Sequence, residues 1–331
     1  SLDQTQDLII DGKESHNLIL APFKANSVER STALYVCNFA TNCSFKNLIV
    51  LNNQKLVGYG AIHITNSQCK LSFEGIHFQS HESNGTDYYQ IAIKCQSGSH
   101  QLNIRNCEFT DFAMDGIYVL GSTSSQTIIG NHFYRLWGKS TIVKCIQITE
   151  GKGHIISNNY FGGNEKFCGA TMLTLSRSCY FSAISLINTA DNETITIANN
   201  VCKNIALTAP AINPSIGGSC TYIVFIKSSV KVNKEILVDT LFRVSGNKCS
   251  DIMLLESSFF GVSMQSNASN SKYSIIKNEF RRVSTIFDQI SNGFFQLFYL
   301  NFTATSCTYI QRNLISDMSI TAPNKETTKS N

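Results

Sequence analysis

Thr127-Ile128-Ile129-Gly130-Asn131-His132-Phe133 is the stretch of this chain that decides its fold. A short β-branched run leads into an asparagine, and a large apolar residue follows two positions later. A seventh, weaker copy at 102–109 has Cys107 in place of the asparagine. The six clear copies of this pattern place their asparagines at Asn131, Asn159, Asn200, Asn247, Asn278 and Asn313.

The asparagine predicts a sharp corner between two strands. Asparagine tolerates the left-handed backbone region better than other non-glycine residues, and its amide can bond to local backbone. When coils stack, such asparagines lie above one another and form an amide ladder. The residue two positions later then points inward, which predicts one stack containing Phe133 and Phe161 and another containing Cys202 and Cys249.

The segments between the corners read as strands. Runs such as 116–120, 145–149, 222–226 and 294–300 are β-branched or aromatic and of strand length, and no amphipathic helix is evident. A propeller would need near-constant spacing, and a sandwich would not repeat one asparagine corner. We therefore predict an all-β chain that forms a right-handed parallel β-helix over 46–320. Residues 1–45 form a cap or the first coils, and 321–331 form a polar tail.

The corners at Asn131, Asn159 and Asn278 share the order I-I-x-N-x-F or a close variant of it. They resemble those of the right-handed parallel β-helix superfamily, the pectate-lyase-like fold, over about residues 45–320. The resemblance implies the fold and says little about function, because this scaffold hosts lyases, hydrolases, epimerases, tailspikes and adhesins.

Charge and hydropathy exclude two classes of partner. Only 15% of residues are charged, the formal net charge is +4, and no basic run exceeds two residues. This is too little for a nucleic-acid footprint, so no nucleic-acid partner is predicted. The longest apolar run, near 294–300, is of strand length, so no membrane span is predicted.

Cysteines and glycosylation sequons predict a secreted or cell-surface protein. The chain has 12 cysteines without zinc-site spacing, and an even count of this kind favours disulfides, with buried free thiols as the alternative. The first residue is Ser1, as expected after removal of a signal peptide. N-glycosylation is predicted at five asparagines, which are Asn42, Asn84, Asn192, Asn267 and Asn301.

The catalytic motifs that the resemblance to this superfamily implies for its enzymes are missing. The chain has no Asp-Asp pair, no Gly-His-Gly and no Asp-Pro-His motif, and paired carboxylates are the requirement for glycoside hydrolysis. A lyase needs a base to take the proton α to a uronate, with Ca²⁺ or arginine neutralising the carboxylate. No cofactor is therefore predicted, and Ca²⁺ enters only under a lyase-like reading.

One constellation of charges remains as a candidate site. Asp115 precedes one strand, Arg135 and Lys144 precede the next, Glu150 follows that strand, and Arg177 follows the strand at 171–175. If these strands stack in register, a patch of acids and bases would bind or cleave an anionic glycan. Lys144 or Arg177 would then be the base.

Aromatic and imidazole side chains give weaker candidates. Trp137 is a candidate platform for a sugar ring, with a place in a satellite core as the alternative. His63 and His77 occupy alternate strand positions and are candidates for one shared face, while His132 and His154 are expected to face solvent. No third ligand accompanies any of them, so no metal site is predicted.

Three classes of function follow. The first is a structural or surface glycoprotein without catalysis, such as a filament or coat subunit that associates end to end. The second is a lyase-like enzyme acting on an anionic polysaccharide. The third is a glycan-binding adhesin without catalysis. The sequence favours the first, because catalytic signatures are missing and sequons are abundant.

Overall fold

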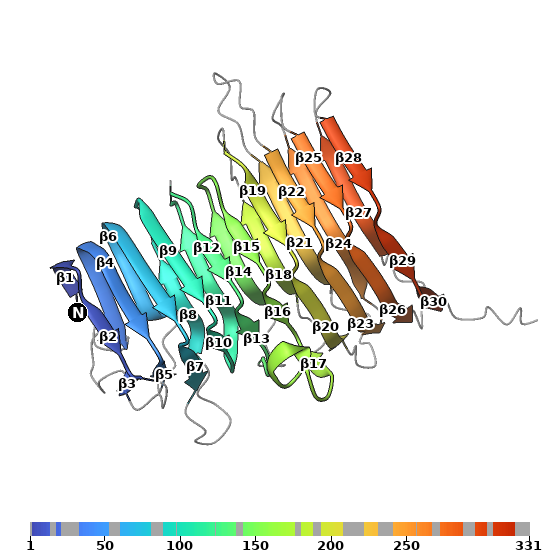
Figure 1. Ribbon diagram of the computed structural model, residues 1–331. Helices are drawn as coiled ribbons and strands as arrows, with labels where there is room; N and C mark the ends of the chain where they lie inside the picture. Colours follow the sequence, from blue (N-terminus) through green and yellow to red (C-terminus); the bar gives the residue numbers. More distant parts are fainter. Residues whose placement is uncertain are drawn as a thin grey trace, which may run out of the picture.

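The computed structural model describes residues 2–13, 18–20, 33–52, 60–80, 89–96, 98–122, 124–136, 142–175, 180–187, 193–207, 222–230, 241–255, 257–266, 272–286, 295–302 and 307–321. These residues form a solenoid in which successive coils lie side by side from the N-terminal to the C-terminal end (Figure 1). The strands pair in parallel, as predicted, and the described regular structure is β apart from the single turn η2 (Lys166–Cys168). The fold is an all-β parallel β-helix.

Each complete coil contributes one strand segment to each of three faces. The first face carries the strands that hold the candidate site described below. Its members are β1 (Leu2–Gln6), β4 (Leu34–Lys46), β6 (Gly60–Glu74), β8 (Tyr89–Cys95), β11 (Phe112–Leu120), β14 (Ile142–Thr149), β18 (Tyr180–Ile187), β21 (Tyr222–Val230), β24 (Ser258–Ser266) and β27 (Phe295–Phe302).

The second face follows in each coil, and the long strands β4 and β6 run through from the first face onto it. Its other members are β2 (Ile9–Asp11), β9 (His100–Arg105), β12 (Thr127–Ile129), β15 (Ile155–Ser157), β19 (Ile195–Ala198), β22 (Leu241–Ser245), β25 (Lys272–Ile276) and β28 (Cys307–Gln311).

The third face is a separate twelve-stranded sheet. It begins with β3 (Leu18–Leu20), which pairs with β5, just as β1 and β2 pair with β4. Its members after β3 are β5 (Leu48–Asn52), β7 (His77–Ser80), β10 (Glu108–Phe109), β13 (His132–Phe133), β16 (Tyr160–Phe161), β17 (Leu173–Leu175), β20 (Val201–Leu207), β23 (Lys248–Leu255), β26 (Glu279–Ile286), β29 (Leu314–Ser316) and β30 (Ser319–Thr321).

An asparagine ladder lies at the corner between the second and third faces. In each rung the Oδ1 atom of one asparagine accepts the backbone N–H and the side-chain amide of the asparagine in the preceding coil, as Asn159 does for Asn131, both at 3.0 Å. Cys107 starts the ladder, because its N–H donates to Oδ1 of Asn131 at 2.9 Å. The predicted ladder is confirmed through Asn131, Asn159, Asn200, Asn247, Asn278 and Asn313.

The sequence predicted that the ladder asparagine would be the left-handed residue at this corner. This prediction is wrong, because the residue before the asparagine is the left-handed one. Gly130 has φ +70°, and Asn158, Asn199 and Lys277 have φ between 55° and 59°. The ladder asparagines are instead buried, apart from the partly buried Asn313, and each amide also donates to a carbonyl in the preceding coil, such as Ile128 for Asn159. The asparagine type is therefore required by its side-chain hydrogen bonds and not by its backbone conformation.

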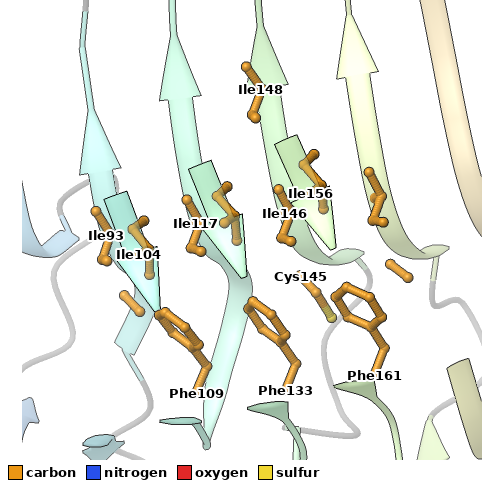
Figure 2. Packing of buried hydrophobic residues seen from close by; sticks show 14 of the residues in the cluster. Ile93, Ile104, Phe109, Ile117, Phe133, Cys145, Ile146, Ile148, Ile156 and Phe161 are labelled. Atoms are coloured by element: carbon orange, nitrogen blue, oxygen red, sulfur yellow. The ribbon is translucent and has the colours of Figure 1, made fainter. Parts of the chain in front are cut away.

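The inward residues of the third face form a single column, where the sequence predicted two. Phe78, Phe109, Phe133 and Phe161 stack with ring centroids 4.6–5.1 Å apart (Figure 2). Cys202 and Cys249 continue that same column in register, followed by Phe280. In Figure 2 isoleucines such as Ile117, Ile146 and Ile156 pack in neighbouring columns above the phenylalanines. This apolar interior runs along the axis of the solenoid.

The predicted disulfides are not formed among the cysteines that the structure describes. Eight of them are buried and form no disulfide: Cys43, Cys69, Cys95, Cys107, Cys145, Cys168, Cys202 and Cys249. They occupy inward positions where other coils have apolar side chains, so they act as small core residues. Burial raises the pKa of the Cys107 and Cys168 thiols to about 12, which keeps them protonated.

Candidate functional site

The strands of the first face bend in the middle, and the bend creates the candidate site. In β11 both Gly116 and Ile117 face the core: a Cβ on Gly116 would lie 2.7 Å from the Phe133 ring, and Ile117 is fully buried. Side chains alternate along a strand, so Asp115 and Tyr118, on either side of this pair, both face outward. Two outward rows therefore run along the solenoid, one on each side of the bend.

Register places polar and charged groups in both rows. Asp115 is opposite Lys144, which is opposite Ser182, in the first row. Tyr118 lies between Lys94 and Gln147 in the second row, and the row continues to Ser185 and Lys227. We call this set the Asp115 strip; its members are Lys94, Asp115, Tyr118, Lys144, Gln147, Ser182, Ser185 and Lys227.

The strip lies on the outer side of the strands, yet several of its side chains are buried. Asp115 is 5% exposed, Gln147 8% and Ser185 1%. The two rows also contact each other across the bend, because Nζ of Lys144 donates to Oε1 of Gln147 at 2.6 Å. Polar groups of the strip are therefore shielded from water.

Burial changes the protonation chemistry of Asp115. It raises the pKa of the carboxyl to about 6, and the positive charges of Lys144 and Lys94 counteract only part of that rise. One carboxylate oxygen, Oδ1, is buried and accepts no hydrogen bond within the described part of the chain. Asp115 is therefore a shielded acid that can change charge near neutral pH.

Two of the lysines in the strip, Lys94 and Lys227, also have altered pKa values. Burial lowers the pKa of Lys94, with Asp115 opposing the shift, and burial together with Lys144 lowers the pKa of Lys227. Nζ of Lys227 lies 5.9 Å from the centre of the Tyr180 ring, within the range of a cation–π contact. Perturbed lysines grouped in one place are typical of functional sites.

His63 adjoins the strip on β6, opposite Lys94. Burial and the Lys94 charge lower the pKa of its imidazole to about 4, against a hydrogen bond to Gln96. His77 lies on β7 in the third face, so the predicted sharing of a face by these two histidines is wrong. They belong to different sheets because the corner at Gly75 lies between them in the chain.

The structure brings together the central pair of the predicted charge patch and separates the other described members. Asp115 and Lys144 are direct partners on β11 and β14. Arg135 instead forms a two-point ion pair with Asp111, at 2.7 and 3.2 Å, on the corner that follows the third face. Glu150 lies exposed at the corner after β14, with φ +70°. Trp137 and Arg177 lie outside the described residues.

The predicted glycosylation sites have two members within the described residues. Asn42 is exposed at a left-handed corner of β4, and Asn301 is exposed on β27. Asn84, Asn192 and Asn267 lie outside the described residues.

A pocket of about 290 Å³ opens on the second face. Basic and amide side chains line it, among them Lys70, Arg105, Gln101 and Asn103, with Asn42 at one side. Its lining is less buried than the Asp115 strip, and Lys70 and Gln101 are exposed. This pocket is a second candidate site for an anion and is the alternative to the Asp115 strip.

A buried polar column on the second face was missed by sequence reasoning. Nδ1 of His154 accepts the N–H of Gln126 at 3.1 Å, and the Gln126 amide donates to the His100 carbonyl at 2.7 Å. All three side chains are fully buried, so the expectation that His154 faces solvent is wrong. His132 is nearly buried too and stacks on Tyr160 at 4.9 Å. These histidines stabilise the coils.

The described part of the chain holds no group of three His, Cys, Asp or Glu side chains that could bind a metal ion. No helix within that part is long and apolar enough to cross a membrane. Comparison with protein-family models, with curated proteins and with solved structures finds no match for this chain.

Proposed function

We propose that this protein is a secreted or cell-surface β-solenoid of the pectate-lyase-like kind that binds a linear acidic glycan along the Asp115 strip. The observation that carries the proposal is the in-register pairing of Asp115 with Lys144 between Lys94 and Lys227. The proposal joins two classes that the sequence left open, a surface glycoprotein and a glycan-binding adhesin.

The charge of the strip favours an anionic ligand. Lys94, Lys144 and Lys227 supply three positive charges, and Asp115 is the one acid in the two rows that the structure describes. Parallel strands are spaced by about 4.8 Å, so these lysines recur about every 10 Å along the axis. A polymer with regularly repeated carboxylate or sulfate groups can contact several of them at once.

The shape of the strip favours a chain over a small molecule. The rows follow the solenoid axis across β8, β11, β14, β18 and β21, which are neighbours in the first face (Figure 1). Shielded hydroxyl and amide groups, such as those of Ser185 and Gln147, lie between Lys94 and Lys227 in the second row and are suited to sugar hydroxyls.

Binding of polygalacturonate and of dextran sulfate, measured by calorimetry at several salt concentrations, tests the proposal. Replacing Lys94, Lys144 and Lys227 together by Gln is expected to weaken binding at least tenfold and to reduce its salt dependence. The control replaces three exposed lysines elsewhere, Lys13, Lys248 and Lys277, by Gln and removes the same net charge. Equal losses in both variants would show nonspecific attraction and overturn the proposal.

The competing pocket on the second face is tested in the same assay. Replacing Lys70 and Arg105 by Gln changes its charge without touching the Asp115 strip. Retained affinity is expected, and loss of binding in this variant alone would move the site to that pocket.

A lyase activity is the second candidate, because the lowered pKa values of Lys94 and Lys227 suit a base that removes a proton. An unsaturated sugar product absorbs ultraviolet light, so release of absorbing ends from uronate polymers measures it directly. Activity that disappears in Lys94→Gln or Lys227→Gln would favour the enzyme. If no polymer yields product, glycan binding without catalysis remains as the proposed function.

Secretion, N-glycosylation and end-to-end association are parts of this proposal. Because the described cysteines form no disulfide, secretion is supported by the sequons, two of which have exposed asparagines, Asn42 and Asn301. Mass analysis of the protein from its own cells, with and without glycosidase, tests occupancy. Sedimentation of the purified protein at increasing concentration tests association.

A further inference from the structure

The position of Asp115 in the strip has a consequence for how ligand binding is controlled. Its side chain lies among groups that attract an anion, while its own negative charge repels one. Register puts Lys144 next to it on β14, and Lys94 lies across the bend on β8. Its Oδ1 atom is buried without a hydrogen-bond partner in the described residues, so the carboxyl has one unused acceptor position.

The strands that pair with β11 are β8 and β14, and the strip groups that they bring beside Asp115 are Lys94, Lys144 and Gln147, with Tyr118 on its own strand. Farther along the sheet lie His63 on β6, Ser182 and Tyr180 on β18, and Lys227 on β21. His63 stays neutral above about pH 4, because burial and Lys94 hold its pKa at about that value. The pKa of Tyr118 is raised by burial and by Asp115, so this phenol also stays neutral near pH 7.

We propose that Asp115 acts as a pH gate for the strip, so that an acidic polymer binds more tightly when this carboxyl is protonated and more weakly when it ionises. The inference rests on the proposed function and adds its regulation. Protonation removes the one negative charge of the two described rows and gives the carboxyl a hydrogen to donate to a ligand oxygen. Binding then takes up one proton, which stays on the Asp115 carboxyl.

The pH range follows from the local environment of Asp115. Burial raises the carboxyl pKa to about 6, so the change falls between about pH 5 and pH 7. A bound anion raises this pKa further, and each unit of that rise makes binding about tenfold tighter at acid pH than at neutral pH. A fully ionised strip retains the three lysines, so binding at neutral pH weakens and is not abolished.

Dextran sulfate is the suitable probe, because sulfate esters stay ionised throughout this range and the ligand itself does not titrate. Affinity is measured at pH 5 and pH 7.5 at one ionic strength. The wild-type protein is expected to bind about tenfold more tightly at pH 5. Asp115→Asn should bind with the acid-side affinity at both pH values, and Glu165→Gln, an exposed acid on the third-face loop, should behave as wild type.

The outcomes separate the inference from the function on which it rests. Wild-type binding that is equal at both pH values overturns the gate and leaves the binding function. A pH dependence that persists in Asp115→Asn also overturns it and assigns the effect to Lys94 or Lys227. If dextran sulfate binds at neither pH 5 nor pH 7.5, both proposals are overturned.

A second measurement does not depend on the variant. Carbon NMR of the Asp115 carboxyl, followed from pH 4 to pH 8 with and without dextran sulfate, reports its titration directly. The midpoint is expected to move upward when the polymer is present. An unchanged midpoint in a saturated complex would contradict the gate.

Discussion

Oδ1 of Asn200 accepts two hydrogen bonds from Asn159, one from the backbone N–H and one from the side-chain amide, both at 3.0 Å. Both residues are completely buried. This single oxygen therefore satisfies two donors that water cannot reach. The same relationship repeats along the ladder and fixes the register of neighbouring coils.

Asn200→Ala should destabilise the protein more than an exposed substitution beside it. The change leaves the two Asn159 donors without their acceptor and removes one hydrogen bond to the Ile156 carbonyl. Each unsatisfied buried group costs about 1–3 kcal/mol, so we expect a loss of about 3 kcal/mol or more in the free energy of unfolding. Chemical denaturation measures it. Asn199→Gly, at the exposed left-handed neighbour, is the control, and a similar loss there would contradict this role of the ladder.

Gly130→Ala tests the corrected position of the left-handed residue. Gly130 has φ +70°, and an added Cβ would lie 2.4 Å from Oδ1 of Asn106. We expect a loss of about 1–2 kcal/mol, since the left-handed region costs that much for a residue with a Cβ. Lys277 has φ +59° at the corresponding corner, so Lys277→Ala should change the free energy of unfolding by less than about 0.5 kcal/mol. Equal effects at both positions would contradict the assignment.

The fold was largely predictable from the sequence because it repeats. One asparagine corner, recurring six times, indicated parallel coils, the ladder and the inward phenylalanines. The left-handed residue was misplaced because Asn131 and Gly130 both suit a corner, and only the side-chain hydrogen bonds distinguish them. The buried column of His100, Gln126 and His154 was missed because these residues share no repeated type.

The candidate site was predictable only in part. Asp115 and Lys144 were found because each lies just before a recognisable strand core. Lys94 and Lys227 were not predicted as members of the Asp115 strip. Their place in it depends on the bend, where Gly116 and Ile117 both face inward and the inward–outward alternation of side chains shifts by one residue. A pair of adjacent inward residues within a strand was the signal that could have located the strip.

Asp115→Asn should stabilise the protein near neutral pH. The folded-state pKa of about 6 is above the value of 3.8 for an unperturbed aspartate, so the native state binds the proton more tightly than the unfolded state does. The protonated Asp115 carboxyl stabilises the folded protein fully below about pH 4, and this stabilisation is lost as the pH rises through 6. At pH 7.5 the ionised carboxyl costs about 3 kcal/mol, at about 1.4 kcal/mol per pKa unit.

Thermal unfolding from pH 4 to pH 8 measures this difference. The gap between Asp115→Asn and the wild type should be small at pH 4 and should widen up to about pH 6.5. His63 and His154 lose stability in the opposite direction, as the pH falls from 6.5 to about 4, but they contribute equally to both proteins. A gap that does not change with pH would contradict the shielded state of Asp115.

The eight described cysteines should resist alkylation in the folded protein. They are buried, and burial raises the thiol pKa of Cys107 and Cys168 to about 12, so little thiolate forms at neutral pH. Iodoacetamide labelling read by mass spectrometry is expected to modify them only after unfolding. A disulfide between Cys202 and Cys249, which lie opposite each other in β20 and β23, would contradict the free-thiol core.

The most direct test of glycan binding along the Asp115 strip is the NMR spectrum of the lysine ammonium groups during titration with an oligogalacturonate. The account predicts that the Nζ signals of Lys94, Lys144 and Lys227 shift together and saturate with one affinity, while those of Lys13, Lys248 and Lys277 stay in place. Shifts confined to Lys70 or spread evenly over exposed lysines would contradict it.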